Sequence, residues 1–236
     1  TAVKIYTIVN TTIASIAWVV IPQLSIHFQK KNYDEINKLL KYALNFILVL
    51  GIPSICGLEI IAPHLISALA GEEYIDASLS LRILGIALLF SFFGGWVGNM
   101  IRIPSGKEKS SLVITSVCAL INLVLNLIMI PIWGLNAAAF TTAVSECVGL
   151  IWGFVLIDRN VKIDGLKKML LAPLIGGFGI LVIGGVVQHF IDKTWLVSLV
   201  TIIVSVIWYF AIMVILKNEF FMGFLYPVIN KLRRNK

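Results

Sequence analysis

Ionisable and amide side chains inside long apolar stretches are the residues of this chain that could do chemistry. The carboxylates of Glu59 and Glu146 lie within such stretches, where a buried charge is costly and usually faces a cavity, a cation or a partner helix. Asn122 and Asn126 are four residues apart and therefore share one helix face. Amides there could hydrogen-bond sugar hydroxyls or a neighbouring helix, and helix association is the commoner role. These residues predict binding chemistry, with packing as the alternative.

The elements that position them are long apolar helices. Hydrophobic residues make up 59% of the chain and charged residues 13%, with a mean hydropathy of +0.97, whereas soluble domains carry about 25% charged residues. A helix needs roughly 20 apolar residues to cross a bilayer. The sequence predicts an all-α membrane protein of about seven transmembrane helices, near residues 5–26, 43–70, 81–103, 111–132, 136–157, 169–191 and 195–216.

Basic residues indicate the orientation of these helices. All but three of the 19 Lys and Arg residues fall after the first, third, fifth or seventh stretch, the exceptions being Lys4, Arg82 and Lys193. Basic residues mark cytoplasmic loops, so we expect a cytoplasmic C-terminus and an external Thr1. Because Thr1 is not an initiator Met and no signal peptide precedes it, the chain is predicted to be a fragment. The division of charge among loops explains the pI of 9.4 without a nucleic-acid partner.

Enzymatic and metal-binding patterns are not found in the sequence. It has no HExxH, GxSxG or P-loop motif. His27 is predicted at the opposite membrane surface from His64 and His189, about 30 Å away, so these histidines cannot form one metal site. We therefore expect a protein that is not an enzyme and that uses no metal or other cofactor.

Three segments in order resemble a known transporter family. They are Ile101 to Lys107 (Ile-x-Ile-Pro-x-Gly-Lys), Asn122 to Pro131 (Asn-Leu-x-Leu-Asn-x-x-x-Ile-Pro) and Gly134 to Ala138 (Gly-x-x-Ala-Ala). Similar patterns occur in bacterial oligosaccharide and polysaccharide flippases of the O-antigen, capsule and teichoic acid type. These flippases belong to the multidrug/oligosaccharidyl-lipid/polysaccharide exporter superfamily, and weaker similarity extends over about residues 2–160.

The resemblance implies the C-terminal half of a fourteen-helix, two-lobe transporter, helices eight to fourteen. Residues 1–160 would be the second lobe without its first helix, residues 161–218 an appended helix pair, and residues 219–236 a cytoplasmic, amphipathic, basic tail. The implied function is alternating-access export of a polyprenyl-diphosphate-linked oligosaccharide across the bacterial cytoplasmic membrane. Implied partners are that lipid-linked oligosaccharide, membrane lipids, the N-terminal lobe, and glycan polymerase or ligase machinery. A multidrug cation antiporter, a lipid II flippase and a nontransporting membrane scaffold remain alternatives.

On this resemblance, the candidate substrate-binding residues of the cavity are Lys4, Glu59, Asn99, Arg102, Asn122 and Asn126. Glu59 and Glu146 are the candidates for ion coupling. A phosphate that enters a cavity of low dielectric constant needs Lys or Arg. Lys4 could instead extend to the membrane surface, and Arg102 could be an ordinary cytoplasmic anchor.

Overall fold

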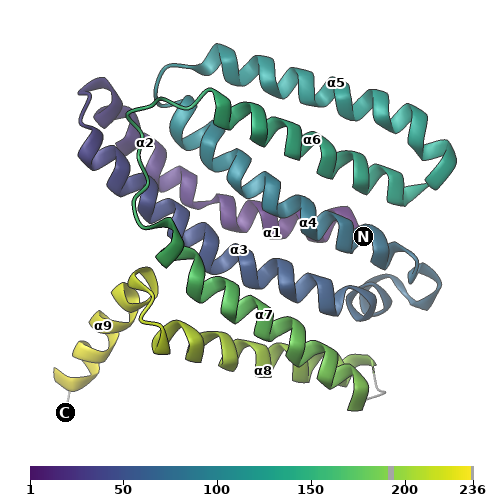
Figure 1. Ribbon diagram of the computed structural model, residues 1–236. Coiled ribbons are helices and arrows are strands. Elements are labelled where there is room, and N and C mark those ends of the chain that lie inside the picture. Colours follow the sequence, from purple (N-terminus) through teal and green to yellow (C-terminus); the bar gives the residue numbers. More distant parts are fainter. Residues whose placement is uncertain (191–193, 235–236) are drawn as a thin grey trace.

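The structure is a computed structural model that describes residues 1–190 and 194–234, and within these ranges it is all-helical (Figure 1). The prediction of an all-α fold with seven long apolar helices is confirmed. Lys193 and the side chains of residues 228–236, including the basic residues of the tail, lie outside what is described. The helices are α1 (Ala2–Ala14), α2 (Ile16–Gln29), α3 (Tyr33–Ala70), α4 (Ala77–Gly95), α5 (Glu108–Trp133), α6 (Leu135–Val155), α7 (Leu166–Phe190), α8 (Thr194–Ile215) and α9 (Glu219–Arg234).

Helix boundaries differ from the prediction at two places. The first apolar stretch is divided at Ser15 into α1 and α2. Helix α3 begins ten residues before the predicted position, because Asn32 caps it by accepting a hydrogen bond from the Glu35 N–H at 3.4 Å. Lys38 and Lys41 fall between the first two predicted stretches, which suggested a loop, but both lie on the first turns of α3.

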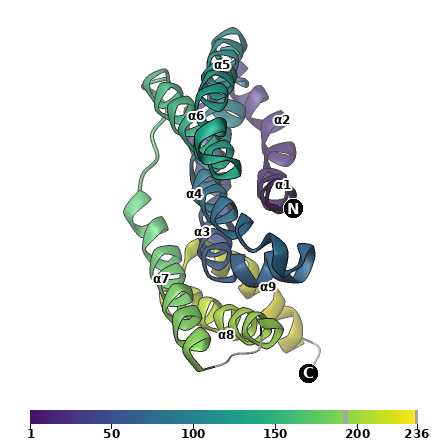
Figure 2. The same cartoon turned by 90° about the vertical axis from the view of Figure 1, so that its right-hand side faces the viewer.

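Helices α3 and α4 form the centre of the molecule, between the α5–α6 hairpin and the α7–α8 pair (Figures 1 and 2). At 38 residues, α3 is about 57 Å long at 1.5 Å per residue, longer than the hydrocarbon core of a bilayer. Its buried side chains supply much of the main hydrophobic core. Trp96, which follows α4, donates from its indole Nε1 to the Leu40 carbonyl oxygen of α3 at 3.1 Å.

Glycines let α7 approach its neighbours closely. A Cβ built on Gly184 would lie 2.2 Å from Cγ2 of Ile60 on α3, and one on Gly176 would lie 2.6 Å from Cδ2 of Tyr209 on α8. Any larger residue at these positions would have to displace its neighbour. The α7–α8 pair is thus packed directly against the central helix, as small residues allow in membrane proteins.

The α2–α3, α4–α5 and α6–α7 connections, which carry basic residues, lie at the same end of the molecule as α9 (Figure 1). Lys107 Nζ donates to the Leu156 carbonyl oxygen at 3.2 Å, and the Lys162 N–H donates to Asn37 Oδ1 at 3.1 Å. Glu219 of α9 accepts from Lys168 at 2.8 Å. The cytoplasmic location of this end stays a prediction, as does the division at residues 160 and 218.

Candidate functional site

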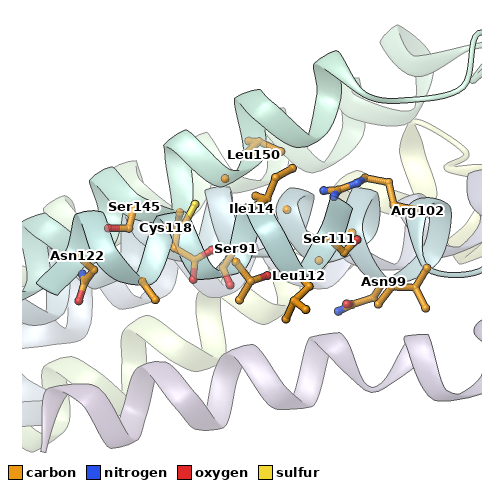
Figure 3. A pocket seen from close by; sticks show the side chains of 18 of the residues that line it. Ser91, Asn99, Arg102, Ser111, Leu112, Ile114, Cys118, Asn122, Ser145 and Leu150 are labelled. Atoms are coloured by element: carbon orange, nitrogen blue, oxygen red, sulfur yellow. The ribbon is translucent and has the colours of Figure 1, made fainter. Parts of the chain in front are cut away.

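A cavity of about 800 Å³ lies between α4, its extension, α5 and α6 (Figure 3). We call it the polar cavity, because hydroxyl, amide and charged side chains from three helices line it. Figure 3 shows Asn122 towards one end and Arg102 towards the other. Its polar lining residues are Ser91, Asn99, Arg102, Glu108, Ser111, Thr115, Asn122, Thr142, Ser145 and Glu146.

A π-helical segment, Trp96–Arg102, continues α4 and forms one wall of the polar cavity. The Ile103 N–H bonds to the Gly98 carbonyl oxygen, five residues back, at 3.0 Å. Such π turns are rare and often occur at functional sites. A Cβ on Gly98 would meet nothing within 4 Å, so this glycine leaves open space beside Asn99 and Arg102, which both line the cavity.

Arg102 is a buried cation, with only 3% of the residue exposed. Its Nη2 donates to Ser110 Oγ at 3.1 Å, while its Nε is buried without a partner. Among the described residues it forms no ion pair. The Arg102 guanidinium lies against α6, with Nη1 3.7 Å from where a Cβ on Gly153 would be, so its side chain is not exposed; the alternative that Arg102 is an ordinary cytoplasmic anchor stays a prediction. An unpaired buried charge is costly, and an anion in the cavity would offset that cost.

The two asparagines of α5 have different surroundings. Asn126 donates to Asn122 Oδ1 at 2.9 Å and accepts from Thr141 Oγ1 of α6 at 2.6 Å. Asn126 therefore joins α5 to α6 and is not among the residues that line the polar cavity, whereas Asn122 is. The spacing of four residues correctly placed both on one face, but only a partner on α6 distinguishes their environments.

The two carboxylates lie in separate places. Glu146 lines the polar cavity from α6, and its Oε2 would be 4.0 Å from a Cβ on Gly94 of α4. Glu59 lies on α3 with Oε1 buried and unpartnered, 3.3 Å from where a Cβ on Gly85 would be. Glu59 does not line this cavity. The structure thus separates the two candidates for ion coupling.

Lys4 lies exposed on α1 and is not among the residues that line the polar cavity. Of the predicted site residues, the cavity therefore brings together Asn99, Arg102, Asn122 and Glu146 and leaves out Lys4, Glu59 and Asn126. The prediction missed Glu108 and Ser111, which begin α5. The sequence feature that could have indicated these two residues is their spacing of about one helical turn, directly after the basic loop. No group of three metal-ligating side chains occurs in the described ranges.

Long apolar helices around a polar cavity define the class of multi-pass membrane proteins. The model of the family described as lipid II flippase MurJ matches residues 2–230, and the chain belongs to this family. Its seven apolar helices and this membership place it among multi-pass proteins of the bacterial inner membrane.

Individual relatives agree with this membership. The chain is 26% identical over 182 residues to the lipid II flippase MurJ of Bacillus subtilis (strain 168), a match that covers 73% of this chain and 33% of that protein. It is 29% identical over 137 residues to the capsular polysaccharide biosynthesis protein CapF of Staphylococcus aureus, covering 58% and 34%. The chain thus spans about a third of the length of these relatives.

A solved structure shows the same fold. The chain superposes on lipid II flippase MurJ in an inward closed conformation with a TM-score of 0.72 and 21% identity, covering 95% of this chain and 46% of that one. The exporter superfamily indicated by the sequence motifs is supported. The family matched is MurJ, which the sequence analysis had placed among the alternatives, and not specifically the polysaccharide flippases.

Proposed function

We propose that the intact protein moves a lipid-linked saccharide precursor of the lipid II type across the membrane. In this proposal, the present chain supplies one wall of the path for the polar head group. The observation that carries the proposal is Arg102, a buried guanidinium without a carboxylate partner on the wall of an 800 Å³ polar cavity. Membership of the MurJ family supports the same function.

The chemistry of the cavity suits such a cargo. A guanidinium binds phosphate oxygens through a planar array of donors, and Asn122, Ser145 and Thr142 offer donors and acceptors for sugar hydroxyls. From Ser111 to Asn122, the wall formed by α5 extends about 16 Å along the helix axis. A head group needs such a lining because it cannot cross hydrocarbon without its hydrogen bonds. The lipid tail has no such need and stays in the bilayer.

The orientation proposed from the basic loops gives Arg102 a specific place in this path. If the basic end faces the cytoplasm, Arg102 lies at the cytoplasmic end of the polar cavity, where a diphosphate made in the cytoplasm would first arrive. The neutral amide and hydroxyl groups of Asn122 and Thr142 would then meet the sugars.

Two related functions are favoured by particular observations. The match to CapF favours a capsular precursor as cargo. Glu146 in the polar cavity favours export of an organic cation. Cargo charge separates the second function from the main proposal, because an anionic cargo requires Arg102 and a cationic one requires Glu146.

The test uses the full-length protein in proteoliposomes, with a fluorescent lipid II analogue and a lipid-linked capsule-type oligosaccharide as probes. We expect Arg102→Gln to lower the flipping rate at least tenfold, because hydrogen bonds to charged groups contribute about 1.5–3 kcal/mol, and Arg102→Lys to restore part of it. Arg159→Gln is the matched control, since Arg159 carries the same charge in an exposed loop at the same end.

Stability separates a binding role from a structural one. An unpaired buried charge costs free energy of folding, so we expect that Arg102→Gln does not lower the unfolding temperature. Full flipping activity in Arg102→Gln would refute the assignment of this residue. Preference for the capsule-type probe would replace lipid II as cargo, and transport of organic cations alone would reject the lipid-linked cargo.

A further inference from the structure

Two prolines interrupt the hydrogen bonds of the central helix α3. Pro53 and Pro63 have no N–H, so the carbonyls four residues earlier, those of Val49 and Glu59, lose their helical donors. Inside a membrane an unsatisfied carbonyl is costly, because no water is present to replace the donor. Each proline therefore creates both a place where the helix can bend and a carbonyl that needs a partner.

Each of these carbonyls receives a side-chain donor from a different helix. Tyr209 of α8 donates its hydroxyl to the Val49 carbonyl oxygen at 2.8 Å, and Tyr209 is only 7% exposed. Arg82 of α4 donates from Nε to the Glu59 carbonyl oxygen at 3.0 Å. The two donors occupy equivalent positions relative to their prolines, although they come from opposite sides of α3.

We propose that Tyr209 and Arg82 are positioning residues that close two proline hinges in α3. Through these two bonds the α7–α8 pair and the wall of the polar cavity are held to the same helix. The second attachment of α4, from Trp96 to the Leu40 carbonyl oxygen, lies about 29 Å along α3 from Glu59. Helix α4 is thus fixed to α3 at both ends, and a bend at Pro53, which lies between Leu40 and Glu59, moves the end held by Arg82 relative to the end that carries Arg102.

The hinges differ from the rest of α3 in what bending requires. Elsewhere, bending must break a main-chain hydrogen bond, whereas at Pro53 and Pro63 only one side-chain bond has to be exchanged. The resting shape of α3 is therefore set by Tyr209 and Arg82. The relevance of these hinges to transport rests on the proposed function, whereas the pairing of each donor with its proline does not.

The pairing predicts a specific pattern of rescue in the full-length protein. Tyr209→Phe and Arg82→Gln should each lower the ratio of folded to unfolded protein by about three- to twentyfold, the range for hydrogen bonds within membranes. Pro53→Ala restores a helical donor for Val49, so it should offset Tyr209→Phe but not Arg82→Gln. Pro63→Ala should offset Arg82→Gln but not Tyr209→Phe. Tyr74→Phe, at an exposed tyrosine, is the control for loss of a hydroxyl.

Cys56 provides a local measure of the first hinge. This free, half-buried cysteine follows Pro53 by three residues, and its Sγ lies 3.0 Å from where a Cβ on Gly177 would be. We expect Tyr209→Phe to raise the rate of N-ethylmaleimide labelling of Cys56 about three- to twentyfold, as read from the Cys56 peptide by mass spectrometry. The Pro53→Ala/Tyr209→Phe double variant should label at the wild-type rate, because the N–H that alanine supplies closes the helix.

The results that overturn the proposal are distinct from failure of the proposed function. Equal rescue of both donor variants by either proline variant, or unchanged Cys56 labelling in Tyr209→Phe, would overturn the pairing. Flipping by the stable double variants should be slower than wild type, since the hinges are lost, and an unchanged rate would overturn their hinge role. If the wild-type protein flips neither probe, the proposed function fails, while labelling and rescue still decide whether the hinges exist.

Discussion

Two adjacent glycines of α7 permit a sharp test of how this helix packs on α3. A Cβ on Gly184 would lie 2.2, 2.8 and 3.0 Å from Cγ2, Cγ1 and Cβ of Ile60, whereas one on Gly185 would meet nothing within 4 Å. We expect Gly184→Ala to destabilise the protein relative to Gly185→Ala. Both substitutions gain the same helix propensity, about 1 kcal/mol, so their difference isolates the steric contribution.

The magnitude follows from the rigidity of Ile60. A β-branched side chain has little freedom at χ1, and one of the contacts is its Cβ, which moves only with the backbone. Overpacking typically costs 1–3 kcal/mol, and the short distances place Gly184→Ala towards the upper part of that range, at about 2–3 kcal/mol relative to Gly185→Ala.

Thermal and chemical unfolding of the purified full-length variants, followed by tryptophan fluorescence, would measure this difference. Ile60→Ala should relieve the effect of Gly184→Ala in the double variant, because it removes the Cγ atoms that a Cβ would meet. Equal stability of the two alanine variants would refute the close approach of α7 to α3.

Three further substitutions test individual contacts. Trp96→Phe removes the donor to the Leu40 carbonyl oxygen from a residue only 4% exposed, and should cost about 1–2 kcal/mol in chemical denaturation. Asn126→Ala should cost about 0.6–1.7 kcal/mol, and a double-mutant cycle with Thr141→Val should assign most of this to their bond. The amino groups of nearby lysines hold the pKa of Glu219 below its ordinary value. The ion pairs of Glu219 with these lysines contribute less than about 1 kcal/mol to stability, because they are exposed. This contribution is present at a pH above the ordinary pKa of the Glu219 carboxyl and is lost as the pH falls through its lowered pKa in the folded protein. The stability difference between wild type and Glu219→Gln should be measurable at pH 7 and vanish at strongly acid pH; a difference that persists there would contradict this origin.

Hydropathy predicted the seven apolar helices because the bilayer imposes both their length and their composition. The start of α3 was mispredicted because it depends on local capping by Asn32 and not on apolar content. The break at Ser15 was likewise invisible to a hydropathy pattern, since the residues on both sides are apolar. Helix boundaries that depend on single hydrogen bonds can be located only from the structure.

The types of residue in the candidate site could be predicted from the sequence, but which of the residues line the polar cavity could not. Periodicity placed Asn122 and Asn126 on one face, yet the bond from Thr141 gives Asn126 a packing partner. Arg102 resembled a surface anchor because it precedes a basic loop, and only the packing of α6 over it reveals its burial. Lys4 and Glu59 were chosen by their charge, their position in apolar stretches and the family resemblance, none of which indicates which neighbours a helix faces.

The π-helical segment at Trp96–Arg102 has a consequence for comparing relatives of this chain. A turn closed by bonds five residues apart holds about one residue more than an α-helical turn. A relative that lacks this extra residue would continue α4 as an ordinary helix, and everything beyond it would keep the same orientation. Its equivalents of Asn99 and Arg102 would then lie at sequence positions shifted by one. Alignments of this region should therefore place a single-residue gap between Gly95 and Ile103. In an alignment without that gap, the functional match for Arg102 would be a basic residue one position away from it.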